Sequence, residues 1–466
     1  MKVLNPMAAF AVTTLAACAA VPPPAANVPA TTPPPVTGAA PKPPVVEATA
    51  PKTLDALAIG YVKLVLAMGE LDADYVDAYY GPAEWRAAIK AQPQNAKQIA
   101  SDAQRLLDVI DHVNGAGPET DPALVALRKD YLKAQLKALL TRARQLDGLK
   151  LSFDDEARAL YDTEAPKYTD AQFEPALKRI EKLLPRGRGT LAERYNRYLD
   201  RYSVPKEKLE AVMQTAIAAA RKTTGDHIAL PVGENFTLSL VHDQPWSAYN
   251  WYQGGYVSKI EVNTALPVAA SRVIDLAAHE GYPGHHVYNA LLEAKLVNGQ
   301  HWPEFQVYAL FSPQSLIAEG SADYGASLAF PQSEKLELTR KLFKQAGFDP
   351  RQAATYLAVL SATHELAPAG LEAARRYLDG TMTPEQTSAW LERYTLASPE
   401  RAKQRLRFFD KYRAYAINYS WGEQVVRRYV EAKGGKVAGS AEQWQVFADL
   451  LSTPRTPSGI TVDAPR

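Results

Sequence analysis

The sequence His279-Glu280-Gly281-Tyr282-Pro283-Gly284-His285-His286 holds three of the chain's eight histidines, together with a glutamate. Imidazole is the commonest metal ligand in proteins, and a neighbouring carboxylate can accept a proton from a metal-activated water. Metal ligands on one helix usually stand four residues apart, but the residue four positions after His279 is Pro283. On an unbroken helix, neither His285 nor His286 could therefore share an ion with His279.

A local distortion of the backbone would remove this conflict. Pro283 deletes one helical hydrogen bond and Gly284 tolerates unusual dihedral angles, so the pair favours a kink or a bulge. Such a bulge could swing His285 back beside His279. The apolar run at 267–278 predicts the helix that leads into the cluster. The alternative is a polar helix end with solvated histidines.

A pair of acids further along the chain supports the metal interpretation. Glu319 and Asp323 are four residues apart after an apolar Leu316-Ile317, so both carboxylates should face one side of a helix. In peptidases whose third zinc ligand is a glutamate, this helix reads Glu-x-x-x-Asp, and the aspartate holds a ligand imidazole by its second nitrogen. Two acids on a solvated helix face are the alternative, but that alternative leaves the histidine cluster without a partner.

Together, the cluster at 279–286 and the segment at 319–324 resemble the bacterial domain-of-unknown-function 885 family. Members of that family are often lipoproteins and are grouped by fold with mostly helical zinc peptidases. The resemblance implies a mainly α fold: a large helical, zincin-like metallopeptidase domain with a small β element, an edge strand, before the metal helix. Tyr288 and Ser321 depart from the family pattern, which often has Gln and Trp there, and this bears on substrate contacts.

The resemblance also implies the roles of the residues in the cluster. His279, His285 and Glu319 would hold one Zn²⁺ per chain, with Glu280 as the general base. His286 is the alternative second ligand, or else a group beside the site. Three protein ligands leave a fourth position for water, which is the arrangement of a catalytic zinc site.

Further groups are expected around these ligands. Asp323 would orient a ligand imidazole. A donor to the oxyanion is expected from a late helix, and Tyr419 is the candidate, with Tyr415 and His364 as alternatives. The segment at 256–263 would be the edge strand that pairs with an extended substrate.

The amino terminus has the pattern of a lipoprotein signal. Lys2 and a short apolar run precede Leu15-Ala16-Ala17-Cys18, which looks like a bacterial lipobox. The signal would be cleaved before Cys18, whose sulfur would carry a diacylglycerol, and Ala19 favours an outer-membrane location facing the periplasm. Cys18 is the only cysteine, so a disulfide framework is excluded. The alternative is an ordinary secretory signal with an incidental cysteine.

The rest of the chain predicts one large helical domain after a linker. Residues 1–18 would be the signal peptide, 19–52 a Pro/Ala-rich disordered linker, and 53–466 the domain. Apolar residues three and four apart predict helices, and alternation predicts strands. The predicted helices include 54–71, 123–146, 173–184, 206–221 and 402–431, the predicted strands are 236–241 and 256–263, and the aromatic-rich 245–252 is predicted as a loop.

These patterns predict a lipid-anchored zinc metallohydrolase, with a peptidase acting on a peptide or small amide as the leading hypothesis. Two alternatives remain: a non-catalytic envelope binding or scaffold lipoprotein with a structural or vestigial metal site, and a hydrolase of non-peptide amides or esters. Glu280 favours the enzymes, because a structural site needs no base. The formal charge of +1 gives no electrostatic case for nucleic acid, and the lipid is the only membrane contact expected.

Overall fold

The computed structural model describes residues 51–113, 121–242, 248–265 and 267–461. The predicted signal peptide, Cys18 and most of the predicted linker lie outside these residues. Within them the fold is mainly helical, as the sequence predicts. Every helix in this part of the chain is too short or too polar to cross a membrane.

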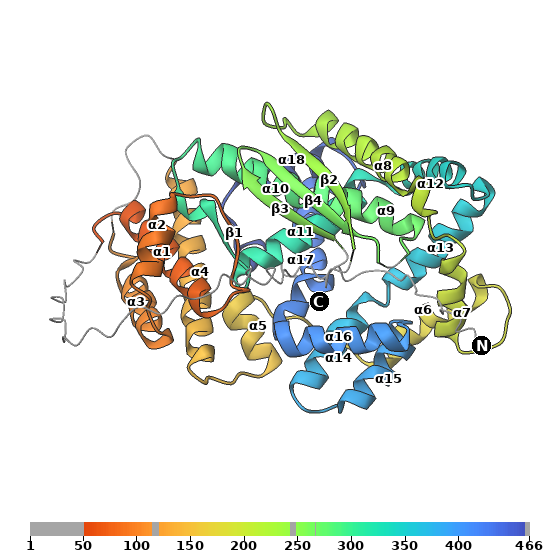
Figure 1. Cartoon of the computed structure of the whole chain (residues 1–466), viewed down its shortest axis with the longest axis horizontal. Helices are drawn as coiled ribbons and strands as arrows, with labels where there is room; N and C mark the ends of the chain where they lie inside the picture. The colour runs from red at the N-terminus through yellow and green to blue at the C-terminus, as the bar shows by residue number, and fades with distance from the viewer. Residues whose placement is uncertain (1–50, 114–120, 243–247, 266, 462–466) are drawn as a thin grey trace, which may run out of the picture.

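The first helices gather at one end of the molecule (Figure 1). The helix predicted at 54–71 is observed with the same bounds, and Thr53 caps it by accepting a hydrogen bond from the backbone of Ala56. Most of this helix is buried, so it forms the centre of the group. The group consists of α1 (Leu54–Leu71), α2 (Ala83–Ala91), α3 (Ala96–Val109), α4 (Pro122–Leu146) and α5 (Phe153–Tyr161).

The later helices build the middle and the opposite end of the molecule (Figure 1). The predictions at 123–146, 173–184 and 206–221 correspond to α4, α6 and α8. The helices are α6 (Asp170–Leu183), α7 (Leu191–Asp200), α8 (Lys206–His227), α9 (Ala270–Leu276), α10 (His285–Leu292), α11 (Pro313–Ala329), α12 (Gln332–Ala346), α13 (Ala353–His364), α14 (Ala367–Leu378), α15 (Pro384–Tyr394), α16 (Pro399–Tyr412), α17 (Ser420–Gly434), α18 (Ala441–Ser452) and α19 (Pro457–Ile460).

The helix predicted at 402–431 is wrong as a continuous element. It is divided into α16 and α17 by a 3-10 segment, η5 (Arg413–Asn418). Arg413 has a φ of 51°, which an α-helix cannot continue through. The guanidinium of Arg413 is held by the Glu156 carboxylate, at 2.7 Å. The break therefore follows from a contact with α5, which local periodicity does not reveal.

A three-stranded sheet covers the middle of the molecule. The predicted strands are confirmed as β2 (Asn235–Val241) and β4 (Val257–Asn263), but the expected edge strand is wrong, because β4 is the central strand in the order β2-β4-β3. The segment predicted as an aromatic loop supplies β3 (Ala248–Gly254), which pairs antiparallel with β4. Strand β2 runs parallel to β4, from Asn235 opposite Val257 to Val241 opposite Asn263.

A second, two-stranded sheet joins the first helical group to the middle of the chain. Its strands are β1 (Val76–Tyr79) and β5 (Val307–Ala309), paired antiparallel. The register shifts between Val76, opposite Ala309, and Ala78, opposite Tyr308. Just after β1, the Tyr80 ring packs edge-on against Tyr252 of β3, with centroids 5.4 Å apart. This contact brings β1 beside the larger sheet.

Helices α11 and α17 cross closely in the centre of the molecule. A Cβ on Gly320 would lie only 2.4 Å from the backbone carbon of Gly422, so this crossing requires glycine at position 320. The approach buries almost all of α11, including Glu319. Figure 1 shows α11 beneath the sheet, with α17 below it.

Candidate metal centre

A π-helical turn carries His279 and Glu280. This turn, η1 (Ala277–Gly281), continues α9, and its wider winding is visible in the hydrogen bond from Tyr282 N to Ala277 O, 3.0 Å long. Gly284 N then donates to Ala278 O at 2.9 Å, and α10 begins at His285. The bulge predicted around Pro283-Gly284 is therefore confirmed, although the widened turn already begins at Ala277.

Gly284 allows the chain to fold back on η1. A Cβ at this position would lie 1.8 Å from the backbone oxygen of His279, which no side chain can occupy. The close approach turns α10 so that His285 faces His279. Their rings are perpendicular, with centroids 4.7 Å apart.

Three buried side chains converge at this point. His279, His285 and Glu319 form a group whose ligand atoms all lie within 4.8 Å of one another. The two Nε2 atoms are 3.1 Å apart, and Glu319 Oε2 lies 3.3 Å from that of His279 and 3.7 Å from that of His285. Ligand atoms about 2.1 Å from a tetrahedral ion stand about 3.4 Å apart. The observed spacings fit one such ion.

The state of the donor atoms also fits a cation. Glu319 Oε2 is buried without a hydrogen-bond partner, although it faces both imidazoles. Burial would raise the pKa of Glu319, but its interactions with the imidazoles of His279 and His285 outweigh it and hold the pKa at about 2. Burial lowers the pKa of His279, yet Asp323, Glu319 and Glu280 raise it well above its usual value. A buried site with this much carboxylate charge favours a positive charge in its centre.

Asp323 and Tyr415 support the ligands from behind. His279 Nδ1 lies 2.9 Å from Asp323 Oδ1, and since a carboxylate only accepts, the proton is on Nδ1 and the lone pair of Nε2 points into the group. The hydroxyl of Tyr415 donates to Glu319 Oε1 at 2.9 Å, leaving Oε2 for an ion. The structure therefore places Asp323 where the sequence predicts it.

His286 lies on the other side of α10 from the ligand group. Its ring is completely buried, with Nδ1 2.9 Å from Ser258 Oγ and Nε2 2.9 Å from Glu234 Oε2. Glu234 also accepts a hydrogen bond from Tyr282, at 2.6 Å. Both ring nitrogens of His286 are thus occupied by the protein, so His285 is the histidine that reaches the ligand group.

Glu280 is completely buried next to the ligands. Strand β3 holds its backbone, because Asn250 Nδ2 donates to Glu280 O at 2.7 Å. Glu280 directly follows the ligand His279 on the π-helical turn, and its charge raises the pKa of His279. This placement is compatible with the predicted base.

The three candidates for an oxyanion donor are in different positions. Tyr415 contacts Glu319 directly, as described above. Tyr419 is buried at the start of α17, with its ring 5.9 Å from that of Tyr415. His364 lies further out, paired with Glu423 at 3.2 Å. Tyr419 and His364 line one pocket with His279.

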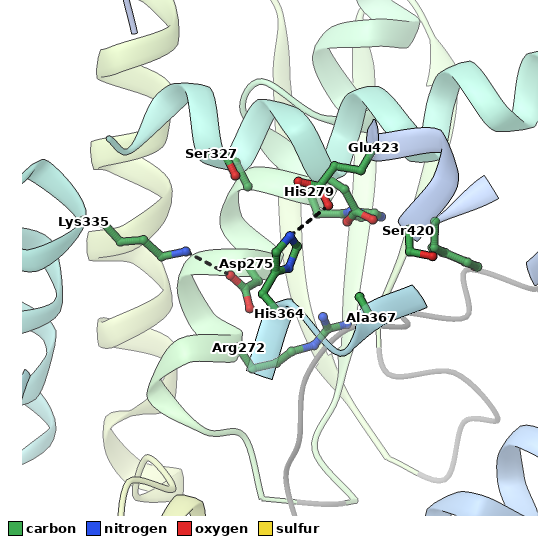
Figure 2. A pocket seen from close by; sticks show the side chains of 12 residues that line it. Arg272, Asp275, His279, Ser327, Lys335, His364, Ala367, Ser420 and Glu423 are labelled. Atoms are coloured by element: carbon green, nitrogen blue, oxygen red, sulfur yellow. Dashed lines mark hydrogen bonds and ion pairs between the residues drawn. The ribbon is translucent and has the colours of Figure 1, made fainter. Parts of the chain in front are cut away.

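This pocket is lined by His279 and Asp323, so it lies beside the ligand group. Figure 2 shows His279 among the residues of its wall. The space within it that a water-sized group can reach is about 100 Å³, so the pocket itself is small. Its wall contains basic and acidic side chains in pairs. Lys335 lies near Asp275 and His364 near Glu423, as the dashed lines in Figure 2 show. His279 lines the pocket, whereas His285 and Glu319 do not.

Two residues near the ligands were missed by the sequence analysis. Asp77 comes from β1, and its carboxyl is affected by the charges of His285, Glu319 and Glu280. Tyr249 of β3 donates its hydroxyl hydrogen to Asp77 Oδ1. An isolated aspartate so far from the cluster carries no motif, so only the fold could identify it.

Comparisons with known proteins leave the family open. No protein-family model matches the chain. No curated protein matches it either. A solved structure, described as the "putative lipoprotein from Colwellia psychrerythraea", is 13% identical, with a TM-score of 0.46, and covers 81% of this chain and 71% of that one. A likeness at this level carries no argument, so membership of the domain-of-unknown-function 885 family stays a prediction.

Proposed function

We propose that this chain is a zinc-dependent metallohydrolase that cleaves peptide bonds. The observation that carries the proposal is the convergence of His279, His285 and Glu319 at spacings that suit one tetrahedral ion, next to the buried Glu280. A zinc ion, when bound, lowers the pKa of water to about 7 and polarises a carbonyl. A structural zinc site usually has four protein ligands, so a group of three beside a carboxylate favours catalysis.

The surrounding residues have separate roles in this proposal. Glu280 accepts the proton of the attacking water and passes it to the leaving amine. Asp323 keeps His279 in the tautomer that ligates, and Tyr415 orients Glu319. Tyr419 is the proposed donor to the oxyanion, since it is buried at the edge of the pocket that His279 lines.

The expected edge strand can be reassigned within this proposal. Strand β4 is central, but within the described residues β3 lies at the edge of the sheet, and it holds the backbone of Glu280 through Asn250. An extended peptide could therefore lie along β3. The lipobox-like end at Cys18 supports a lipid tether to the bacterial envelope, which mass spectrometry of the mature amino terminus would test.

Metal content and turnover test the proposal together. The purified chain should contain about one zinc ion, and a chelator should remove activity that zinc restores. Glu280→Gln should keep the zinc while hydrolysis of a mixed peptide library falls by roughly 10²- to 10⁴-fold, the range of a general base. The control is Glu334→Gln, which changes an exposed glutamate of α12 and should leave both unchanged.

Three results would contradict the proposal or a part of it. Protein purified without metal chelators and still free of metal would exclude a zinc hydrolase. Zinc-loaded protein that cleaves no peptide in the library would exclude the peptidase, leaving the non-catalytic lipoprotein or an amidase or esterase. Full activity of Glu280→Gln would remove Glu280 as the base.

A further inference from the structure

The end of α6, the loop after it and α7 form a strongly basic stretch. Residues 178–201 contain eight lysines and arginines against three acids, a net charge of +5, whereas the whole chain carries +1. The balanced total therefore conceals a segregation of charge along the chain. A local excess of positive charge attracts anionic partners even when the net charge of a protein is close to zero.

Most of these cations are exposed and are not neutralised by an acid. Six of the eight are exposed and, within the described residues, form no ion pair. Together they are called the basic cluster: Lys178, Lys182, Arg186, Arg188, Arg197 and Arg201. The other two, Arg179 and Arg194, pair with Glu365 and Glu181. The nearby acids are thus engaged by these two arginines, and the basic cluster keeps its charge.

Helix α16 has a similar charge in sequence but not in structure. Its segment at 401–413 contains six basic residues and one acid. However, Lys411 pairs with Asp74 at 3.0 Å, and Arg413 pairs with Glu156 at 2.7 Å. The cations of this helix are therefore used partly inside the protein, whereas those of the basic cluster face solvent.

The spacing of the basic cluster places its helical members in pairs. Lys178 and Lys182 are four residues apart on α6, so they share one side of that helix. Arg197 and Arg201 are likewise four apart, in the last turn of α7 and at its C-cap. Each helix thus presents two positive charges side by side.

The loop between the helices joins the two pairs. Arg194 of α7 donates to the backbone oxygen of Pro185 at 3.2 Å, and Arg197 donates to that of Arg188. Arg194 also reaches Glu181 in the last turn of α6, at 3.4 Å. The loop therefore packs along α7 and close to the end of α6. The basic cluster is one extended area over two helices and a loop, which suits an extended anionic surface better than a single small anion.

The basic cluster lies far from the start of the folded domain. Figure 1 shows α6 and α7 at one end of the molecule and α1 at the other. Helix α1 begins at Leu54, directly after the predicted linker at 19–52, so the proposed lipid tether joins the domain at the end opposite to the basic cluster. The 34 residues of this linker span at most about 110 Å when extended, enough for the domain to lie along a membrane.

We propose that the basic cluster binds the anionic phospholipid headgroups of the membrane that the lipid tether enters, so that the molecule is held at both ends. Lysines and arginines near an anionic bilayer each add to the attraction. The tether raises the effective concentration of headgroups around the cluster, an advantage that a soluble polyanion lacks. The inference goes beyond the proposed hydrolase and does not depend on it.

Vesicle binding tests the proposal. The full chain with Cys18→Ala carries no lipid, so an acyl chain cannot drive its binding. We expect it to bind vesicles with about 30% phosphatidylglycerol at least about 10-fold more tightly than pure phosphatidylcholine vesicles at about 0.1 M salt. Raising the salt to about 0.5 M should remove this preference, because the Debye length falls. The apolar amino terminus contacts both kinds of vesicle and cancels in the comparison.

Three variants in this background locate the effect. Neutralising the basic cluster should abolish the preference for anionic vesicles, and the variant is Lys178→Gln, Lys182→Gln, Arg186→Gln and Arg188→Gln. A control removes the same charge from exposed lysines on separate elements and should keep the preference: Lys90→Gln, Lys137→Gln, Lys341→Gln and Lys436→Gln. A charge-conserving variant should also keep it, since the attraction depends on charge: Lys178→Arg, Lys182→Arg, Arg186→Lys and Arg188→Lys.

Several outcomes would overturn the inference. Equal binding of both kinds of vesicle by the parent chain would exclude a headgroup-binding surface, and an equal loss in the control would show that net charge alone acts. Loss of the preference in the charge-conserving variant would indicate recognition of particular side chains. Binding to soluble polyphosphate without a preference among vesicles would favour a soluble polyanion. If circular dichroism shows that the neutralised variant is unfolded, the salt series and the charge-conserving variant decide.

Discussion

The adjacent histidines His285 and His286 differ in what surrounds each ring. His286 is held at both nitrogens by Ser258 and Glu234, so a metal would have to displace two hydrogen bonds in a completely buried position. His285 faces His279 and Glu319 instead. The two histidines therefore differ in role: His286 stabilises the packing, and His285 is placed to bind a metal.

The sequence could predict part of this residue pattern. The spacing of Glu319 and Asp323 predicts one helix face, and α11 presents both toward His279. The choice between His285 and His286 stayed open, because the groups that occupy His286 come from β4 and from the loop before β2. Only tertiary structure brings Ser258 and Glu234 to that ring.

The pair formed by His364 and Glu423 predicts a pH-dependent contribution to stability. The hydrogen bond and charge of Glu423 raise the pKa of His364, although burial lowers it and Arg427 opposes it. Burial would raise the pKa of Glu423, but His364 and Arg427 hold it at about 2. The raised pKa of His364 contributes to the free energy of unfolding fully below its unfolded pKa of about 6.5, and this contribution is lost as the pH rises through its folded pKa. The lowered pKa of Glu423 contributes fully above its unfolded pKa of about 4.5, and this contribution is lost as the pH falls toward 2.

The stability difference between wild type and His364→Gln should therefore be largest between about pH 4.5 and 6.5 and should disappear in alkali. Since half of the His364 side chain is exposed, at 50%, we expect at most about 1 kcal/mol. Urea unfolding across this pH range measures the difference. A difference that is constant with pH would show that His364 acts by packing alone.

At the scale of elements, the π-helical turn η1 decides the geometry of the site. On a regular helix His285 would lie off the face that carries His279, whereas the wider turn and the reversal at Gly284 bring the two histidines together. The sequence predicts a break here from Pro283 and Gly284. It does not predict that the winding already changes at Ala277, well before Pro283.

For the strands too, the sequence predicts where a strand lies along the chain but not which other strands pair with it. Alternating residues predict β4 correctly, since its side chains at Ser258, Ile260 and Val262 point into the protein. Whether a strand is central or at an edge depends on which other segments pair with it. Aromatic residues at 248–252 are typical of strands as well as of loops, and pairing with β4 selects the strand.

Gly284→Ala tests the role of the turn. A Cβ 1.8 Å from His279 O forces the backbone apart, so we expect a loss of about 1–3 kcal/mol in the free energy of unfolding, and zinc affinity at least about 10-fold weaker, because His285 moves away from His279. Urea unfolding and competition with a zinc-binding dye measure the two effects.

Gly225→Ala is the control, since nothing lies within 4 Å of a Cβ in this exposed part of α8. It should stabilise the chain by about 0.5–1 kcal/mol and leave zinc affinity unchanged. Unchanged zinc affinity in Gly284→Ala would contradict the role given to the turn.

At the scale of the whole molecule, the site is assembled from distant segments. Helices α10 and α11 and the turn η1 supply the ligands, β3 and β1 supply Tyr249 and Asp77, and η5 supplies Tyr415. Helical periodicity predicts most of these helices. It cannot predict that Asp77 contacts Tyr249, because this contact depends on how the first helical group packs against the sheet.

A buried ion pair fixes the first helical group to the segment that leads into α11. Arg128 of α4 contacts Glu304 twice, at 2.6 and 3.0 Å, and both side chains are fully buried. Arg128 also pairs with Asp55 of α1 at 2.5 Å and lies over the Trp302 ring, 4.5 Å from its centroid. Glu304 belongs to η3 (Pro303–Gln306), directly before β5. The pair therefore connects three elements around β1 and β5.

Glu304→Leu should lower the free energy of unfolding by about 3–5 kcal/mol, because it leaves a buried guanidinium with only the exposed Asp55 as partner. Arg128→Met combined with Glu304→Leu should be less destabilised than the single variant, since no buried charge remains. Urea unfolding measures the free energy of unfolding of the single and the double variant.

Both variants should still bind about one zinc ion under native conditions, because the Arg128–Glu304 pair contacts none of the ligands. A double variant as unstable as the single one would show that shape rather than charge balance controls this junction. A loss of zinc in the folded variants would show that the position of β5 and α11 depends on the pair, and with it the placement of Glu319.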